Sequence, residues 1–172
     1  MSTILSIETS TEVCSVAVHR DGQLLGFAES RRQKSHSSLV VAMIDQLLSN
    51  ANVEKKELSA IAVSKGPGSY TGLRIGTSTA KGLCYALGIP LIAIDTLKSM
   101  ALEASMHVVG EAFIIPMLDA RRAEVYCEVF NQDMEMITGP EPVILDHESF
   151  RHFKKESKLV ILGNGATKAA EL

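Results

Sequence analysis

The amino-acid sequence predicts an α/β protein in which mixed β-sheets are covered by helices. The first observation behind this prediction is the order strand, strand, strand, helix, strand, helix, strand, helix over residues 1–107. Such alternation packs as a sheet with helices on its faces. The second observation is that the same order begins again after residue 107, which indicates an internal duplication. The sequence therefore predicts two subdomains, residues 1–107 and residues 108–172.

Short apolar runs and turn residues predict the strands of both halves. In the first half they cover residues 3–7, 13–19, 24–29, 58–64 and 91–94, and in the second half residues 113–118, 124–130, 134–138 and 159–162. The first-strand ends carry Glu8 and Asp119, and the sequence Glu-Val follows each of them at 12–13 and 124–125. These matches align residues 8–13 of the first half with residues 119–125 of the second half.

Apolar residues at three-to-four spacing predict the helices. One covers residues 37–50, with Ser35 or Ser37 as its N-cap, and a second covers residues 71–87 and ends at Gly88. A third begins after Asp95 or Thr96 and runs to about residue 107, and a further helix is expected near residue 148.

Composition excludes several classes of protein. A net charge of -3 and a pI of about 6.0 argue against a freestanding nucleic-acid binder, which normally carries a strongly basic face. The three cysteines are widely spaced and form no Cys-x-x-Cys pair, so neither a disulfide framework nor a zinc site is indicated. A reducing cytoplasm is the expected compartment. Neither an export signal nor a membrane span is expected, because the most apolar stretch, 83–94, is short and broken by Gly88 and Pro90.

The segment 66–76, with the sequence GPGSYTGLRIG, is rich in glycine and opens a predicted helix. Glycines allow close backbone approach and a helix N-terminus offers amides to an anion, so a phosphate site is conceivable. The P-loop motif itself is absent, because Leu73 and Arg74 follow Gly72 in place of Lys and Ser or Thr. A stripe of small residues also runs along this helix at four-residue intervals: Gly72, Gly76, Ala80 and Cys84. Such a stripe admits a neighbouring helix of either the same chain or a partner.

Several polar residues are candidates for chemistry. Glu8 ends the first strand, where sugar kinases and actins place an acidic residue and a phosphate-binding turn, but no glycine follows it closely. Asp119 and Arg121 can bind a polar ligand, or they can belong to a structural ion pair. His36 has no second histidine within one helical turn, so a position in the helix cap is favoured over a metal ligand. Ser69 has no neighbouring base in the sequence that would activate it as a nucleophile.

Four further stretches complete the pattern that the 65–76 segment begins: ILSIETS at 4–10, CSVAV at 14–18, KSHS at 34–37 and LDAR at 118–121. Together they resemble the TsaB family, formerly called YeaZ. The resemblance implies an actin-like ATPase fold, of the ASKHA and ribonuclease H-like type, with duplicated mixed-sheet subdomains. Family members usually continue with further helices, so the second subdomain is expected to be truncated here.

The resemblance also implies a function. TsaB proteins act as non-catalytic subunits of the complex that forms threonylcarbamoyladenosine next to the anticodon in tRNAs that read codons starting with A. The related subunit TsaD carries the metal and transfers the group, and TsaE is an ATPase that joins them. In this chain Val40 stands where a His-x-x-x-His motif starting at His36 would need its second histidine. Neither a catalytic residue nor a metal ligand is therefore expected here, whereas ATP or ADP and a metal ion are expected in the partner complex, and tRNA is expected to bind only through it.

The resemblance places pairing on the two helices at 37–50 and 71–87, either with TsaD or in a homodimer. The expected interface residues are His36, Leu39, Met43, Tyr70, Gly72, Leu73, Arg74, Gly76 and Ala80. A possible polar site consists of Glu8, Asp119 and Arg121. The alternatives are an enzyme of the same fold, either a kinase or a glycoprotease-type peptidase, and a homodimeric module outside tRNA modification.

Overall fold

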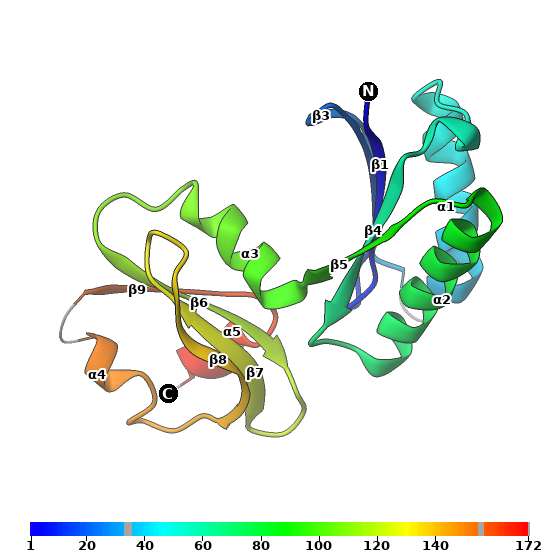
Figure 1. Cartoon of the computed structure of the whole chain (residues 1–172). Helices are drawn as coiled ribbons and strands as arrows, with labels where there is room; N and C mark the ends of the chain where they lie inside the picture. Colours follow the sequence, from blue (N-terminus) through cyan, green and yellow to red (C-terminus); the bar gives the residue numbers. More distant parts are fainter. Residues whose placement is uncertain (33–35, 155–156, 172) are drawn as a thin grey trace. The chain divides into compact units, whose positions relative to one another are not determined.

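The computed structural model describes residues 1–32, 36–154 and 157–171, and it divides the chain into two compact units, Met1–Ile94 and Asp95–Leu172 (Figure 1). The predicted boundary after residue 107 is wrong. Helix α3 (Thr96–Ser105) packs against strands β6 (Ala112–Asp119) and β7 (Glu124–Phe130), so it belongs to the second unit. Asp95 caps this helix, as predicted, by accepting a hydrogen bond from the Lys98 amide (3.4 Å).

The first unit is built on a five-stranded mixed sheet with the order β3-β2-β1-β4-β5. Its strands are β1 (Thr3–Glu8), β2 (Cys14–Arg20), β3 (Gln23–Ser30), β4 (Ala60–Gly66) and β5 (Leu91–Asp95). Strand β1 lies in the centre, antiparallel to β2 and parallel to β4. Buried residues alternate along β1 and β2, as the period of two of a strand with one fully covered face requires.

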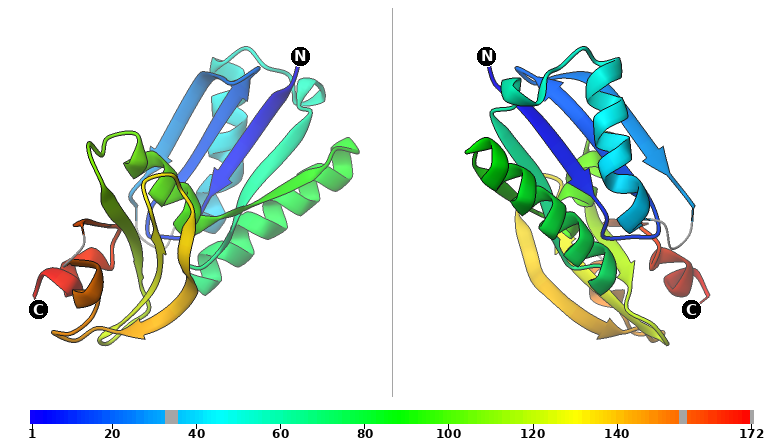
Figure 2. Two further views of the ribbon diagram at one scale, coloured as in Figure 1. Left: turned by 60° about the vertical axis from the view of Figure 1, so that its left-hand side comes forward. Right: turned by 90° about the vertical axis from the view of Figure 1, so that its right-hand side faces the viewer.

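Helices α1 (His36–Asn50) and α2 (Tyr70–Leu87) cover one face of this sheet (Figure 2). Helix α1 packs on β2 and β3, α2 packs on β4 and β1, and the two helices contact each other. Val40 and Ile44 of α1 join Leu5 and Val16 of the sheet in one buried apolar core. Apolar residues three and four apart on the helix thus meet alternate residues of the strands, which is the pattern that predicted both elements.

The helix ends follow local sequence signals. Gly88 ends α2 in the left-handed conformation, with a φ of 65°, where a side chain would be strained. Ser37 lies inside α1 and is not its N-cap, and the alternative cap, Ser35, lies outside the described residues. A short 3-10 helix at Lys55–Glu57, which the apolar pattern does not reveal, links α1 to β4.

The second unit repeats this arrangement with a four-stranded sheet in the order β8-β7-β6-β9, where β8 is Met136–Ile144 and β9 is Lys158–Leu162. Helix α3 covers one face, around Ile114 and Phe130. The short helices α4 (Arg151–Lys154) and α5 (Ala166–Ala170) pack on β9 and β6. Strand β8 begins two residues later than the predicted start at 134 and runs six residues beyond the predicted end at 138. It contains prolines at 140 and 142, which an edge strand tolerates.

The first four strands of each unit occupy equivalent places, since β3-β2-β1-β4 and β8-β7-β6-β9 are the same order. The predicted duplication and the actin-like α/β fold are therefore confirmed. The two Glu-Val pairs are not equivalent, however. Glu124 begins β7, whereas β2 begins only at Cys14, after Glu12 and Val13. In the described part of the chain, no helix is both long enough and apolar enough to cross a membrane.

Candidate functional site

The carboxyl end of β1 meets the beginning of α2 in the first unit. Glu8, the last residue of β1, accepts hydrogen bonds from the Ser10 amide (2.5 Å) and from the Ser64 hydroxyl at the end of β4. Both carboxylate oxygens of Glu8 are thus engaged within the unit. Its role in this structure is to hold the turn after β1 against β4.

The small residues of α2 fit closely against this turn. The buried Thr9 hydroxyl donates a hydrogen bond to the Gly72 carbonyl (2.8 Å). A Cβ added at Gly72 would overlap the Thr9 carbonyl oxygen, and one added at Gly76 would overlap the Thr9 hydroxyl. Ala80 has no exposed surface. The stripe of small residues therefore packs against the sheet of its own chain.

The glycine-rich loop before α2 is bonded to the same turn. The Ser69 amide donates a hydrogen bond to the Ser10 carbonyl (2.6 Å), and Gly68 adopts a φ of 155° with Ser10 so near that a Cβ would clash. The Ser69 hydroxyl accepts a hydrogen bond from the Gly72 amide (3.3 Å) and so caps the helix. These bonds occupy two of the amides that a phosphate would need and fix the Ser69 side chain in a structural role.

The outward side of α2 carries large exposed side chains. Tyr70 and Tyr85 are 75% and 92% exposed, and the Arg74 guanidinium lies over the Tyr70 ring, 5.5 Å from its centroid. Lys81 is exposed between Arg74 and Tyr85. On the neighbouring helix α1, Val41 is 53% exposed. The positions 70, 74, 81 and 85 share one side of an α-helix, so these four residues form a continuous face, here called the α2 outer face.

The predicted interface residues divide by burial. Tyr70 and Arg74 are exposed, as pairing requires, whereas Leu39, Met43 and Leu73 are half-buried. The inclusion of four others is corrected, because they are buried in their own unit: His36, Gly72, Gly76 and Ala80. The His36 ring nitrogen Nε2 lies 3.0 Å from the Thr11 carbonyl, which fixes the start of α1 to the turn after β1.

Sequence reasoning missed Lys81, Tyr85 and Val41 in this region. A helical projection from Tyr70 and Arg74 would have found Lys81 and Tyr85, since both lie on the same side of the helix. Val41 gave no such signal, because an apolar residue in an amphipathic helix is expected to be buried.

The second unit contains the other predicted polar residues, Asp119 and Arg121. The Asp119 carboxylate accepts hydrogen bonds from the Lys168 ammonium (2.9 Å) and the Arg121 amide (2.6 Å). The Lys168 bond, followed by the Arg121 amide, lowers the pKa of Asp119 below its ordinary value. Asn164 accepts a hydrogen bond from the Asp119 amide (2.9 Å), so the glycine-flanked turn at 163–165 also serves a structural role. Of the two alternatives for Asp119, the ion pair is the one present, with Lys168 as its partner.

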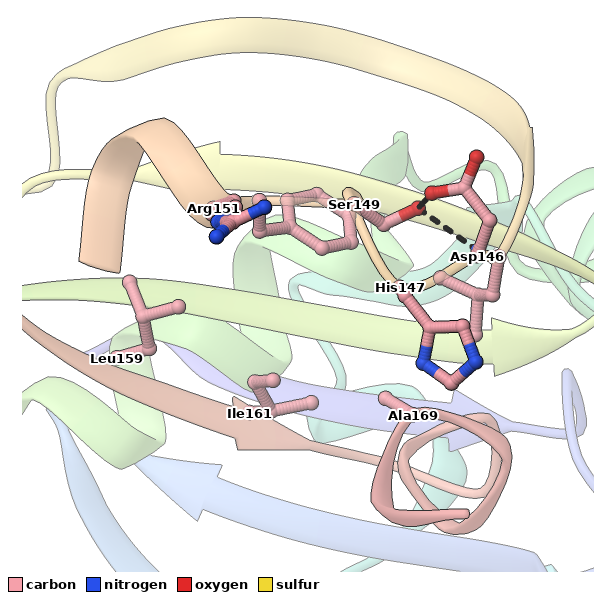
Figure 3. A pocket seen from close by; sticks show the side chains of 9 residues that line it. Asp146, His147, Ser149, Arg151, Leu159, Ile161 and Ala169 are labelled. Atoms are coloured by element: carbon pink, nitrogen blue, oxygen red, sulfur yellow. Dashed lines mark hydrogen bonds between the residues drawn. The ribbon is translucent and has the colours of Figure 1, made fainter. Parts of the chain in front are cut away.

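A pocket of about 290 Å³ opens in the second unit (Figure 3). Leu159, Ile161 and Ala169 form an apolar floor, and the polar lining residues are Asp146, His147, Ser149 and Arg151. The Ser149 hydroxyl donates directly to the Asp146 carboxylate (2.9 Å). This bond, together with the Glu148 amide, lowers the pKa of Asp146 and belongs to the turn before α4. None of the residues predicted to form a site lines this pocket.

The remaining reactive groups are buried or dispersed. Cys14, Cys84 and Cys127 are free thiols in the cores, and burial raises the pKa of Cys127 to about 11. Among the residues that the structure describes, no three His, Cys, Asp or Glu side chains gather as a metal site would need.

Comparison with known proteins places this geometry in a family. Residues 16–157 match the family model described as TsaD, tRNA N6-adenosine threonylcarbamoyltransferase. The chain is 36% identical over 72% of its length to a Haemophilus influenzae protein named tRNA threonylcarbamoyladenosine biosynthesis protein TsaB, and spans 52% of that relative. It is 33% identical over 94% of its length to the Bacillus subtilis protein of the same name, of which it spans 71%.

Solved structures agree with the sequence relatives. YeaZ from Pseudomonas aeruginosa superposes with a TM-score of 0.70 at 33% identity, over 87% of this chain and 69% of that one. An uncharacterised protein with similarity to peptidase YeaZ gives a TM-score of 0.74 at 26% identity, over 99% and 91% of the two chains. The chain belongs to the TsaB family, also known as YeaZ.

Proposed function

We propose that this chain is an accessory subunit in the formation of threonylcarbamoyladenosine in tRNA, and that it supports a transferase of the TsaD type without carrying the reaction itself. The observation that carries the proposal is membership of a family whose relatives are named for the biosynthesis of this nucleoside. The match to the transferase family model adds a reason for the choice of partner, because related folds can pair through equivalent helices.

The accessory role is supported by what the polar groups near the end of β1 do. Glu8 holds Ser10 and Ser64, and Ser69 caps α2. A general base or nucleophile needs a polar atom that can reach a substrate, and these groups are committed to the fold. Under this proposal, the rest of a cytoplasmic complex supplies ATP or ADP, the metal ion and the ATPase TsaE, and tRNA also binds through that complex.

The α2 outer face is the proposed contact with the transferase. Aromatic and arginine side chains are enriched at protein interfaces, where they supply contact area and directed hydrogen bonds. Tyr70, Arg74 and Tyr85 provide this chemistry on a regular helix whose opposite side is fixed by Thr9 and the sheet. Val41 extends the exposed apolar area onto α1.

Reconstitution with purified components tests the accessory role. The cognate transferase, the ATPase subunit, threonylcarbamoyl adenylate and unmodified tRNA are incubated with and without this chain, and the modified nucleoside is measured by mass spectrometry. The expected result is modification only when the transferase and this chain are both present. Modification by this chain without the transferase, or equal modification when this chain is left out, would contradict the proposal.

A further inference from the structure

We infer that the turn between β6 and β7, residues 120–123, binds the phosphate backbone of the tRNA through the side chains of Arg121 and Arg122. This turn is here called the β6–β7 turn. The inference rests on the proposed function, because it names the part of this chain that meets the tRNA in the complex. The turn belongs to the second unit, whereas the contact proposed for the transferase lies on α2 of the first unit.

The backbone of the β6–β7 turn is unfavourable for the residues that form it. Arg121 and Arg122 both adopt the left-handed conformation, with φ values of 74° and 48°. Glycine takes this conformation freely, and asparagine and aspartate tolerate it better than other residues do. The hairpin of β2 and β3 shows this usual choice, because Asp21 and Gly22 take its two positive φ values, 49° and 81°. Two adjacent arginines at such positions indicate a role outside the fold.

Hydrogen bonds hold the turn in this conformation. The Arg121 amide donates to the Asp119 carboxylate (2.6 Å), and the Glu124 amide donates to the Arg121 carbonyl (3.0 Å). The Lys168 ammonium joins the two ends of the turn, because it donates to the Asp119 carboxylate and to the Glu124 carbonyl, at 2.9 Å each. None of these bonds uses a guanidinium, so the network fixes the backbone and leaves the two arginine side chains available to a ligand.

The charge around the turn is positive. Arg121 and Arg122 are exposed, and neither forms an ion pair with any residue in the ranges 1–32, 36–154 and 157–171. Of the two neighbouring carboxylates, Asp119 is already paired with Lys168. The turn with its flanking residues Asp119 and Glu124, together with Lys168, therefore has three positive and two negative charges, whereas the whole chain has a net charge of -3.

Phosphate matches this arrangement in charge and in geometry. A guanidinium is always charged and binds a phosphate through two parallel hydrogen bonds. A protein carboxylate offers the same two bonds, but the proposed function supplies a polyanion, the tRNA. Contacts with the phosphate backbone give affinity without reading the sequence. Such a contact is local, so it agrees with a chain whose overall charge argues against a freestanding nucleic-acid binder.

Binding of unmodified tRNA to the complex of this chain with its cognate transferase tests the inference. The affinity is measured by filter binding between about 0.05 and 0.2 M salt. The variant Arg121→Gln with Arg122→Gln should bind tRNA about tenfold or more weakly at the lower salt concentration. The slope of log affinity against log salt should become shallower by about 0.7–0.9 for each phosphate contact that is lost.

A matched control is Lys98→Gln with Lys158→Gln, which removes the same charge from exposed positions of α3 and β9. Its affinity for tRNA should stay within about twofold of wild type, with the same salt slope. Light scattering coupled to size-exclusion chromatography shows whether each variant still forms the complex, and circular dichroism shows whether it is folded.

A third variant, Arg121→Asn with Arg122→Gly, separates the strain of the turn from binding. Asparagine and glycine suit the left-handed conformation, so this variant should unfold at a higher urea concentration than wild type does. It should nevertheless bind tRNA as weakly as the glutamine variant, because it also lacks both guanidiniums. Binding as tight as that of wild type would overturn the inference.

The remaining outcomes distinguish this inference from the proposed function. If wild type forms no complex with the transferase, the proposed function fails. If the complex forms but binds no tRNA, or if the glutamine variant keeps the wild-type affinity and salt slope, the inference alone is overturned. A folded glutamine variant that no longer joins the transferase would also overturn it, and would assign the β6–β7 turn to a carboxylate surface of a protein.

Discussion

At the scale of single residues, Thr9 explains why α2 carries glycines on its inner side. Its carbonyl and hydroxyl occupy the space where side chains at Gly72 and Gly76 would lie, and its hydroxyl bonds the Gly72 carbonyl. Gly82, on the same helix, is exposed and has open space around the position of a Cβ. Gly72 and Gly76 are thus required by the same close contact with Thr9, whereas Gly82 is not, although the three glycines look alike in the sequence.

Substitution of Gly72 and Gly82 by alanine separates these causes. Gly72→Ala should lower the free energy of unfolding by about 1–3 kcal/mol, because the new methyl group overlaps backbone atoms of a packed turn. Gly82→Ala should raise it by up to about 1 kcal/mol, because alanine loses less backbone entropy in a helix. Urea unfolding of both variants measures the difference. Equal effects from the two substitutions would show that the inner side of α2 is not closely packed.

The ion pair of Asp119 and Lys168 predicts a dependence of stability on pH. The bound ammonium lowers the pKa of Asp119 in the folded chain below its ordinary value of 3.8. A lowered folded pKa means that the stabilisation is present above that ordinary value and is lost as the pH falls through the folded pKa. The wild-type advantage over Asp119→Asn in urea unfolding should therefore be larger at pH 7 than at pH 3. The effect should be small, since the side chain is 43% exposed.

The control for this prediction is the same comparison made in a Lys168→Met background. There the pH dependence of the difference should largely vanish, because the largest cause of the pKa shift is removed. A difference that stays constant from pH 7 to pH 3 in the wild-type background would contradict the assignment.

At the scale of elements, the 18 residues of α2 have three structural roles. Its N-terminus is capped by Ser69, its inner side packs on Thr9 and the sheet, and its outer face is exposed. The predicted helix began within one residue of the observed one, because the apolar spacing and Gly88 are local signals. The neighbour of the small-residue stripe was not predictable, because the four-residue spacing is the same whether the stripe packs against a sheet of its own chain or against a partner.

The cap is tested by Ser69→Ala and Ser69→Asp. Alanine should cost about 1 kcal/mol of stability, because the Gly72 amide loses its acceptor, whereas aspartate should retain most of the stability, because its carboxylate also accepts this bond. Both variants should support tRNA modification in the reconstituted assay as well as wild type does. If Ser69→Asp remains fully stable but the assay loses activity, the hydroxyl has a role beyond the cap.

At the scale of the whole molecule, the repeated strand order was predictable and the division of the chain was not. Apolar residues recur every two positions in a strand and every three to four in a helix. Because these are local patterns, the elements and their order follow from the sequence. The place of α3 depends on its tertiary contacts with β6 and β7, which no local pattern shows. The full length of β8 also depends on the fold, since a strand can contain prolines when it lies at the edge of a sheet.

The candidate site was also predictable only in part. Tyr70 and Arg74 lie on an exposed face as expected, and the polar residues Glu8 and Asp119 lie at equivalent strand ends. Each of these carboxylates accepts the amide of the residue two positions on, from Ser10 and from Arg121, which repeats one turn in both units. The donors that complete these turns, the Ser64 hydroxyl and the Lys168 ammonium, are distant in sequence and become neighbours of the carboxylates only through the fold.

Light scattering coupled to size-exclusion chromatography, on mixtures of this chain with its cognate transferase, tests the central claim most directly. Two variants are compared with wild type: Tyr85→Asp on the α2 outer face and Val109→Asp in the second unit, at positions that are 92% and 91% exposed. The account predicts a one-to-one complex with wild type and with Val109→Asp, and its loss with a folded Tyr85→Asp. A complex that forms equally well with Tyr85→Asp, or that wild type fails to form, would contradict it.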